Sequence, residues 1–185
     1  LPGTGGESVG PTNSSSNSTS STGGSSEGGA GMGGEGEGGG PAPVCNYTAP
    51  ETCEGAEPMP AIAGDTGSPV VTRTGDKSKW YKIHIEEQDS SIFESDLSYT
   101  VTLASPPGMN YDLRVRQGAQ NGPPNCNGTL KVGAGNPETV SDSWDDDQGF
   151  GGEDDSVWLI IEVVYVSGDL CGPNNQWTLT VRGNT

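Results

Sequence analysis

The sequence predicts an all-β protein: an antiparallel, jelly-roll-like β-sandwich of about eight strands, preceded by a long Gly/Ser-rich tail. Two observations predict this fold. Side chains alternate between apolar and polar over many short runs, and clusters of Gly, Pro, Asn and Asp separate these runs. Short strands joined by frequent turns are typical of β-sandwiches and β-barrels.

The clearest strand is Leu97–Leu103 (LSYTVTL), whose apolar residues share one face while Ser98, Thr100 and Thr102 share the other. The segment Val157–Val166 is apolar on both faces, as expected for a central strand. The remaining strands are predicted at Val70–Thr74, Trp80–Ile85, Tyr111–Arg116, Thr129–Val132, Thr139–Ser141 and Trp177–Arg182. The predicted core comprises Tyr81, Ile83, Leu97, Tyr99, Val101, Leu113, Val115, Trp158, Ile160, Leu179 and Val181.

Residues 1–43 differ sharply in composition from residues 44–185. The first segment is almost entirely Gly, Ser, Thr, Asn, Pro and Glu, so it cannot offset the entropy lost on ordering. We expect residues 1–43 to be a flexible tether and residues 44–185 to be one folded domain. Because the sequence starts at Leu1 without a methionine, we expect a preceding segment such as a signal peptide, and the tether fits a lipoprotein anchor.

The net charge of -17, with only 8 Lys and Arg residues, disfavours binding to nucleic acids and to anionic membrane surfaces. No apolar run approaches the roughly 20 residues that a membrane-spanning helix needs. The longest run, Val157–Val166, is interrupted by Glu162. Partners are therefore expected among extracellular proteins, polysaccharide surfaces or other copies of the chain.

Four cysteines favour disulfides over a zinc site, since no C-x-x-C occurs and His84 is the only histidine. Cys45 and Cys53 are near enough in sequence to close a local loop, and Cys126 and Cys171 would then pair across the domain. We expect this connectivity because it strains the chain less than the other two. Disulfides in turn predict an extracellular or cell-surface location.

The strongest chemical signal is the stretch Ser143–Ser156 (SWDDDQGFGGEDDS). Calcium takes six to eight oxygen ligands, and carboxylates on both sides of a glycine-rich turn can supply them. The stretch does not follow the EF-hand pattern, because Trp144 and Asp147 occupy positions that need an oxygen ligand and a glycine. We therefore expect an irregular calcium loop with ligands from Asp145, Asp146, Asp147, Glu153, Asp154 and Asp155, joined by Asp142 or Asp112.

The alternative is that these charges only keep the turn soluble and protect strand edges from pairing with other chains. Six like charges so close together repel one another, and a bound cation would relieve that repulsion. The sequence leaves both interpretations open.

Catalysis has little support in the sequence. His84 lies on the polar face of its predicted strand, where an exposed structural histidine is expected rather than a general base. A hydrolase using paired carboxylates would need them in a cleft, and these lie on a glycine-rich turn. Trp80 and Trp144 are the tryptophans available for stacking on a sugar, whereas Trp158 and Trp177 fall in phase with the core.

The order GDKSKWYKIHI, LSYTVTL, GMNYDLRVR, SVWLIIEVVYVSG and QWTLTVRG resembles the bacterial pre-peptidase C-terminal domain over roughly residues 64–183. The resemblance places Asp76, Trp80 and Tyr81 on its first signature strand, Asp112 and Leu113 on its D-L strand, and Trp177, Leu179 and Val181 on its last. It implies a jelly-roll-like sandwich that accompanies exported enzymes as a non-catalytic module, some members of which bind calcium. These 185 residues include no peptidase domain beside the region of resemblance, and Trp177 stands where the family usually has Tyr.

Together these observations predict a non-enzymatic, exported binding, adhesion or accessory module, with calcium as a candidate structural cofactor. The first alternative is a subunit of an extracellular fibre, in which packing between subunits orders the glycine-rich tail. The second alternative is a secreted hydrolase.

Overall fold

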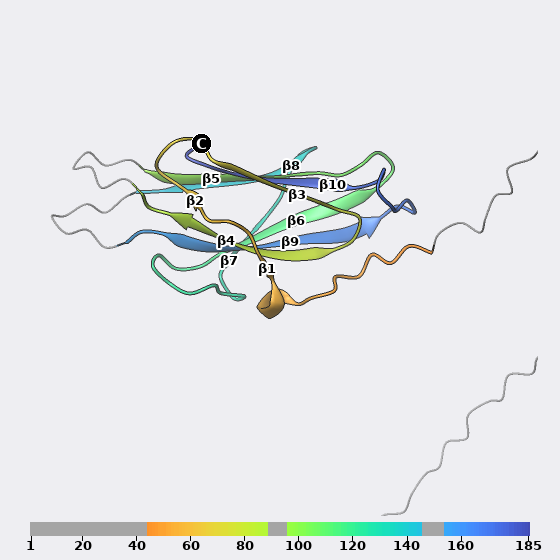
Figure 1. The fold of residues 1–185 in the computed structure, drawn as a ribbon, viewed down its shortest axis with the longest axis horizontal. Coiled ribbons are helices and arrows are strands. Elements are labelled where there is room, and N and C mark those ends of the chain that lie inside the picture. Colours follow the sequence, from red (N-terminus) through yellow and green to blue (C-terminus); the bar gives the residue numbers. More distant parts are fainter. Residues whose placement is uncertain (1–43, 89–95, 146–153) are drawn as a thin grey trace, which may run out of the picture. The chain divides into compact units, whose positions relative to one another are not determined.

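The computed structural model describes residues 44–88, 96–145 and 154–185. The chain divides into two units, Leu1–Gly40 and Pro41–Thr185. Every described residue belongs to the second unit, whose strands form two packed sheets (Figure 1). The predicted all-β sandwich is therefore confirmed.

The six-stranded sheet has the order β1-β4-β9-β6-β7, with β2 also paired to β4. Its long central strands are antiparallel, whereas the short strands β1 and β2 run parallel to β4. Its members are β1 (Glu57–Pro58), β2 (Ile62–Ala63), β4 (Lys79–Glu86), β9 (Val157–Ser167), β6 (Asn110–Gln117) and β7 (Thr129–Val132).

The four-stranded sheet is antiparallel throughout and has the order β3-β10-β5-β8. Its members are β3 (Val70–Gly75), β10 (Trp177–Gly183), β5 (Leu97–Ala104) and β8 (Glu138–Trp144). The last strand of the chain, β10, lies between β3 and β5, so the sheet closes only when the C-terminal segment is in place.

All eight predicted strands are present, each within a few residues of its expected bounds. The sequence did not reveal β1 and β2, which are two residues long and too short to show alternation. It also did not reveal the single 3-10 turn η1, Cys53–Gly55.

The core lies between the two sheets, and ten of the eleven predicted residues are buried, all except Trp158. The assignment of Trp158 is wrong, and Ile160 is buried outside the cluster between the sheets, because Val157, Leu159, Ile161 and Val163 point into that cluster instead. The cause is the apolar character of β9 on both faces, which hides the phase of the strand. Ile160 is only 2% exposed, so other residues cover its side chain on the outer side of the six-stranded sheet.

All four cysteines form disulfides, but the predicted pairing is wrong. Cys45 is bonded to Cys171, and Cys53 to Cys126. The error arises because Cys45 and Cys53, though close in sequence, lie beside different parts of the fold. Cys45 lies at the loop between β9 and β10, while Cys53 lies in η1, beside the loop that joins β6 to β7.

The Cys53–Cys126 disulfide lies on the outer side of the six-stranded sheet, the side on which Ile160 is buried (Figure 1). Cys53 lies in η1, which contacts β4 near one edge of the six-stranded sheet, and Cys126 precedes β7 at the other edge. Figure 1 shows η1 and the loop after β6 on the side of this sheet that faces away from the four-stranded sheet. We call residues 44–58 and 118–128, joined by this disulfide, the strap. The strap covers the outer side of the six-stranded sheet.

Candidate functional site

The predicted calcium ligands fall at one end of the sandwich, where β4 ends and β9 begins. Asp145, Asp154 and Asp155 are described, whereas Asp146, Asp147 and Glu153 lie outside the described residues. Asp155 is only 5% exposed, and its carbonyl oxygen accepts a hydrogen bond from Trp144 Nε1 at 2.9 Å.

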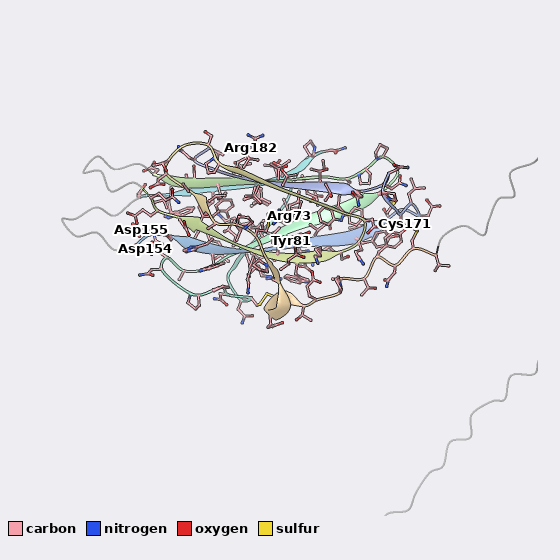
Figure 2. All side chains as sticks on the ribbon, viewed as in Figure 1. Arg73, Tyr81, Asp154, Asp155, Cys171 and Arg182 are labelled. Carbon is pink, nitrogen blue, oxygen red and sulfur yellow. A yellow bond between two sulfur atoms is a disulfide. The ribbon has the colours of Figure 1, made fainter. Side chains whose placement is uncertain are left out.

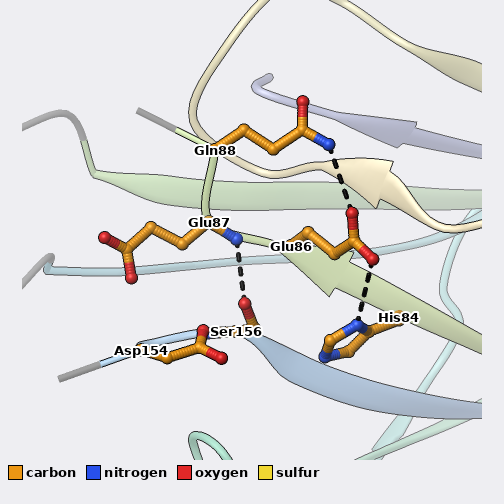
Figure 3. A network of polar contacts seen from close by, with 6 residues as sticks. All are labelled: His84, Glu86, Glu87, Gln88, Asp154 and Ser156. Atoms are coloured by element: carbon orange, nitrogen blue, oxygen red, sulfur yellow. Dashed lines mark hydrogen bonds and ion pairs between the residues drawn. The ribbon is translucent and has the colours of Figure 1, made fainter. Parts of the chain in front are cut away.

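Polar contacts connect the end of β4 with the start of β9, and Figure 3 draws the one between Glu87 and Ser156. The Glu87 N–H donates to Ser156 Oγ at 2.9 Å, and the Asp155 N–H donates to Glu87 Oε2 at 2.9 Å. The Ser156 N–H donates to Asp154 Oδ1 at 3.0 Å. The two bonds of Glu87 join the end of β4 to the start of β9.

The hydrogen bonds with Ser156 also affect the ionisation of Asp154. Hydrogen bonds from the side chain and backbone of Ser156 lower the pKa of Asp154, because they stabilise its ionised form. On the neighbouring strand, His84 Nδ1 lies 3.4 Å from Glu86 Oε1, and Gln88 Nε2 donates to Glu86 Oε2 at 3.2 Å (Figure 3).

Within residues 44–88, 96–145 and 154–185, no three His, Cys, Asp or Glu side chains are grouped so that they could hold a metal ion. Asp142, one of the additional acids considered, forms an ion pair with Lys131 on β7. The described members of the predicted ligand set therefore do not make a calcium site by themselves. Calcium binding stays a prediction from the sequence.

The tryptophans are arranged differently from the sugar platform considered above. Trp80 and Trp158 both lie on the outer side of the six-stranded sheet, whereas the Trp144 ring packs against the core, 6.1 Å from the Tyr99 ring. The Trp158 ring stacks on His84, with centroids 4.6 Å apart and planes at 16°. Trp80 and Trp144 thus belong to different sheets and do not form one platform.

The outer side of the four-stranded sheet carries a regular array of threonines. One row crosses all four strands, because Thr72 is paired with Thr180, Thr180 with Thr102, and Thr102 with Thr139. Directly opposed residues of an antiparallel pair point to the same side of the sheet. In a second row Thr74 is paired with Thr178. We call the outward threonines of this sheet the threonine face: Thr72, Thr74, Thr100, Thr102, Thr139, Thr178 and Thr180.

The threonine face is uncharged apart from one basic residue. Arg182 lies opposite Val70 and Thr100, and the other outward positions on these four strands are Ser, Ala or Val. None of them is Asp or Glu, although the chain has a net charge of -17. The hydroxyls also contact one another, since Thr100 Oγ1 donates to Ser141 Oγ at 3.2 Å.

The sequence contains a signal for this face in the spacing of its threonines. The motif T-x-T occurs three times, at residues 72–74, 100–102 and 178–180. The alternation within Leu97–Leu103 placed Thr100 and Thr102 on one side of a strand, but nothing local shows that the three motifs are neighbours. That follows only from the position of β10 between β3 and β5.

Comparison with known proteins identifies no family. No family model matches the chain, and no curated protein has a similar sequence. A structure of the infectious bursal disease virus Gx strain is similar over 64% of this chain, at 12% sequence identity and a TM-score of 0.21. The similar region is 34% of that virus chain, and a TM-score this low supports no argument about fold or function. Among the described residues, no helix has the length and apolar character that a membrane crossing requires.

Proposed function

We propose that this chain is a non-catalytic, extracellular adhesion module of the pre-peptidase C-terminal type that binds a neutral polysaccharide through the threonine face. The observation that carries the proposal is the four-strand row of threonines on a sheet surface that contains no carboxylate. Two disulfides support an extracellular location, since such bonds persist mainly in oxidising compartments.

The chemistry of threonine suits a polymer of sugar rings. Each side chain offers a hydroxyl, which both donates and accepts hydrogen bonds, and a methyl group that packs against the C–H groups of a sugar. Neighbouring threonines of one row are about 4.8 Å apart, and alternate residues on one strand about 6.8 Å apart. This regular spacing lets one polymer chain make repeated contacts of the same kind.

The charge of the chain and the twist of the sheet limit which polymers can bind the threonine face. A net charge of -17 repels acidic polymers, and a basic partner would be drawn to the carboxylates, none of which lies on this face. Neighbouring strands rotate by roughly 20–25°, so the face is twisted and does not match a planar crystal surface. A flexible, uncharged polysaccharide chain can follow such a surface.

The test is co-sedimentation or biolayer interferometry of the full chain with dextran, galactomannan and hydroxyethyl cellulose, with alginate as an acidic comparison. The test variant is Thr72→Val/Thr102→Val/Thr180→Val, which removes three hydroxyls and keeps side-chain shape. Thr129→Val, on β7 in the other sheet, is the matched control. At about 1 kcal/mol per hydrogen bond, the triple variant should lose tenfold or more in affinity, and the control should not.

Three results would contradict the proposal: no binding to any neutral polymer, equal binding by the triple variant, or preference for alginate. Self-association of the parent chain that is abolished in the triple variant would instead support the alternative, a subunit of an extracellular assembly. Sedimentation velocity at several protein concentrations separates this case.

Calcium is proposed as a structural cofactor on the sequence alone, through the acidic stretch that begins at Asp145. The test is calorimetry on the full chain, with Asp145→Asn/Asp146→Asn/Asp147→Asn as the variant. A calcium concentration ten times the dissociation constant should stabilise the parent by about 1.4 kcal/mol. If calcium produces no heat of binding and no shift in melting temperature, the stretch is an acidic turn that protects strand edges.

A further inference from the structure

The chain enters the described domain beside its last loop and is fixed there. Cys45 is bonded to Cys171, 126 residues away. The Tyr47 ring stacks on the Tyr165 ring with centroids 4.0 Å apart and planes at 4°, and the Ser78 N–H donates to the Tyr47 carbonyl at 2.9 Å. The first described residues are therefore held at the end of β9, next to the loop that leads into β10.

The strand that follows Cys171 is β10, which is hydrogen-bonded on both sides. Six residue pairs join it to β3 and six join it to β5. Its first residue, Trp177, is 1% exposed, and Trp177 Nε1 donates to the Lys77 carbonyl at 2.9 Å. Figure 2 shows Cys171 beyond one end of this strand and Arg182 near the other.

We propose that the Cys45–Cys171 disulfide makes the domain a tension-bearing connector, in which a pull on the chain before Cys45 passes directly to β10. The disulfide closes a covalent ring that contains residues 45–171 and therefore every strand from β1 to β9. Tension between the two chain ends crosses the disulfide and continues only through residues 172–185. The nine strands inside the ring cannot be pulled out in sequence.

The geometry of β10 suits this load. The pull enters at the Trp177 end and leaves at the Gly183 end, so it acts along the strand. Antiparallel hydrogen bonds run perpendicular to the strands, so such a pull shears the bonds to β3 and β5 together instead of opening them one by one. The central threonines Thr178 and Thr180 lie on the same strand, but the inference does not depend on what the threonine face binds.

The test is single-molecule force spectroscopy on the full chain, with handles at Leu1 and Thr185. In the oxidised protein, unfolding should release only residues 172–185, about 50 Å of extended chain at 3.6 Å per residue. Residues 1–44 precede the disulfide in every variant, so they contribute no difference between variants.

Two variants and one reagent give distinct lengths. Cys45→Ser/Cys171→Ser frees the large ring but keeps the 73-residue separation closed by Cys53–Cys126, so it should release about 240 Å. The matched control Cys53→Ser/Cys126→Ser should still release about 50 Å. Adding dithiothreitol to the folded parent breaks both bonds without any mutation and should release about 500 Å.

If a variant fails to fold, the parent protein measured with and without dithiothreitol still provides the test. A release of 200 Å or more from the oxidised parent would overturn it, because strands inside the ring would then lie in the tension path. A release that is the same with and without dithiothreitol would overturn it as well. Neither result depends on polysaccharide binding, which is measured separately.

Discussion

The two sheets present outer faces of opposite kinds. The outer face of the six-stranded sheet carries aromatic and charged side chains, among them Trp158, Lys82 and Arg116, and the strap covers its centre. The outer face of the four-stranded sheet carries threonines, and Thr185 is hydrogen-bonded to Ser98 and Thr100 at one corner of it. We therefore expect changes on the first face to affect stability and changes on the second to affect the proposed binding.

The largest effect on the free energy of unfolding is expected at Ile160, an apolar residue on the covered face. Lys82 and Arg116 flank it on the neighbouring strands, and it is 2% exposed. Ile160→Ala should therefore cost about 2–4 kcal/mol, as in a core, measured by urea unfolding. Thr180→Ala, at the corresponding outward place in the middle of the other sheet, is the comparison. A cost below about 1 kcal/mol at Ile160 would show that the strap does not bury this face.

The second effect concerns the strap itself. Cys53→Ser/Cys126→Ser should lower the free energy of unfolding by about 2–4 kcal/mol, because the disulfide no longer restricts the unfolded chain. Ile160→Ala should cost less in this background, since the side chain is already more exposed. Binding through the threonine face should be unchanged. If the folded variant loses polysaccharide binding, the strap and the threonine face do not act independently.

A smaller effect on stability is expected from Thr180→Val, in the centre of the threonine face. Valine keeps the shape and the preference for strands, so the free energy of unfolding should change by no more than about 0.5 kcal/mol. Affinity for the neutral polymer should fall several-fold, because one hydroxyl is lost. Thermal melts and binding curves on the same samples test both statements. A large drop in melting temperature would mean that this hydroxyl has a structural role.

The smallest effect, on the pH dependence of stability, is expected at Asp154. Its pKa is lowered in the folded protein by hydrogen bonds from Ser156, so the ionised form contributes stability above the pKa of the unfolded chain. That contribution is lost as the pH falls below about 4 and through the lower, folded pKa. Asp154→Asn keeps an oxygen acceptor for the Ser156 N–H but does not titrate. The parent should lose more stability than this variant between pH 5 and pH 2 in urea melts, and parallel curves would contradict the assignment.

The sequence predicts the strands well because alternation is a local property. The run Leu97–Leu103 shows its inner and outer faces directly, and the structure confirms them. Alternation fails at Val157–Val166, where both sides of β9 are apolar for different reasons: one packs in the core, and Ile160 lies beneath the strap. The strap itself is formed by a disulfide and by loop residues, which have no periodic signal.

Features that depend on long-range topology could not be predicted. The disulfide pairing depends on where Cys45 and Cys53 are placed against segments more than 70 residues away. The threonine face likewise needs β10 to insert between β3 and β5, which no local pattern specifies. Of the acidic stretch, Asp145, Asp154 and Asp155 are among the described residues, and the Asp155 N–H bonds to Glu87 at the end of β4.

The most direct test of the contrast between the faces is a methyl NMR titration of the full chain with the neutral polysaccharide that binds best. Threonine methyls report on one face, and the methyls of Leu130 and Val132, which are 46% and 59% exposed on β7, report on the other sheet. The account predicts shifts at Thr72, Thr102 and Thr180 and none at Leu130 and Val132. Shifts confined to Leu130, Val132 and their neighbours would place binding on the six-stranded sheet and contradict it.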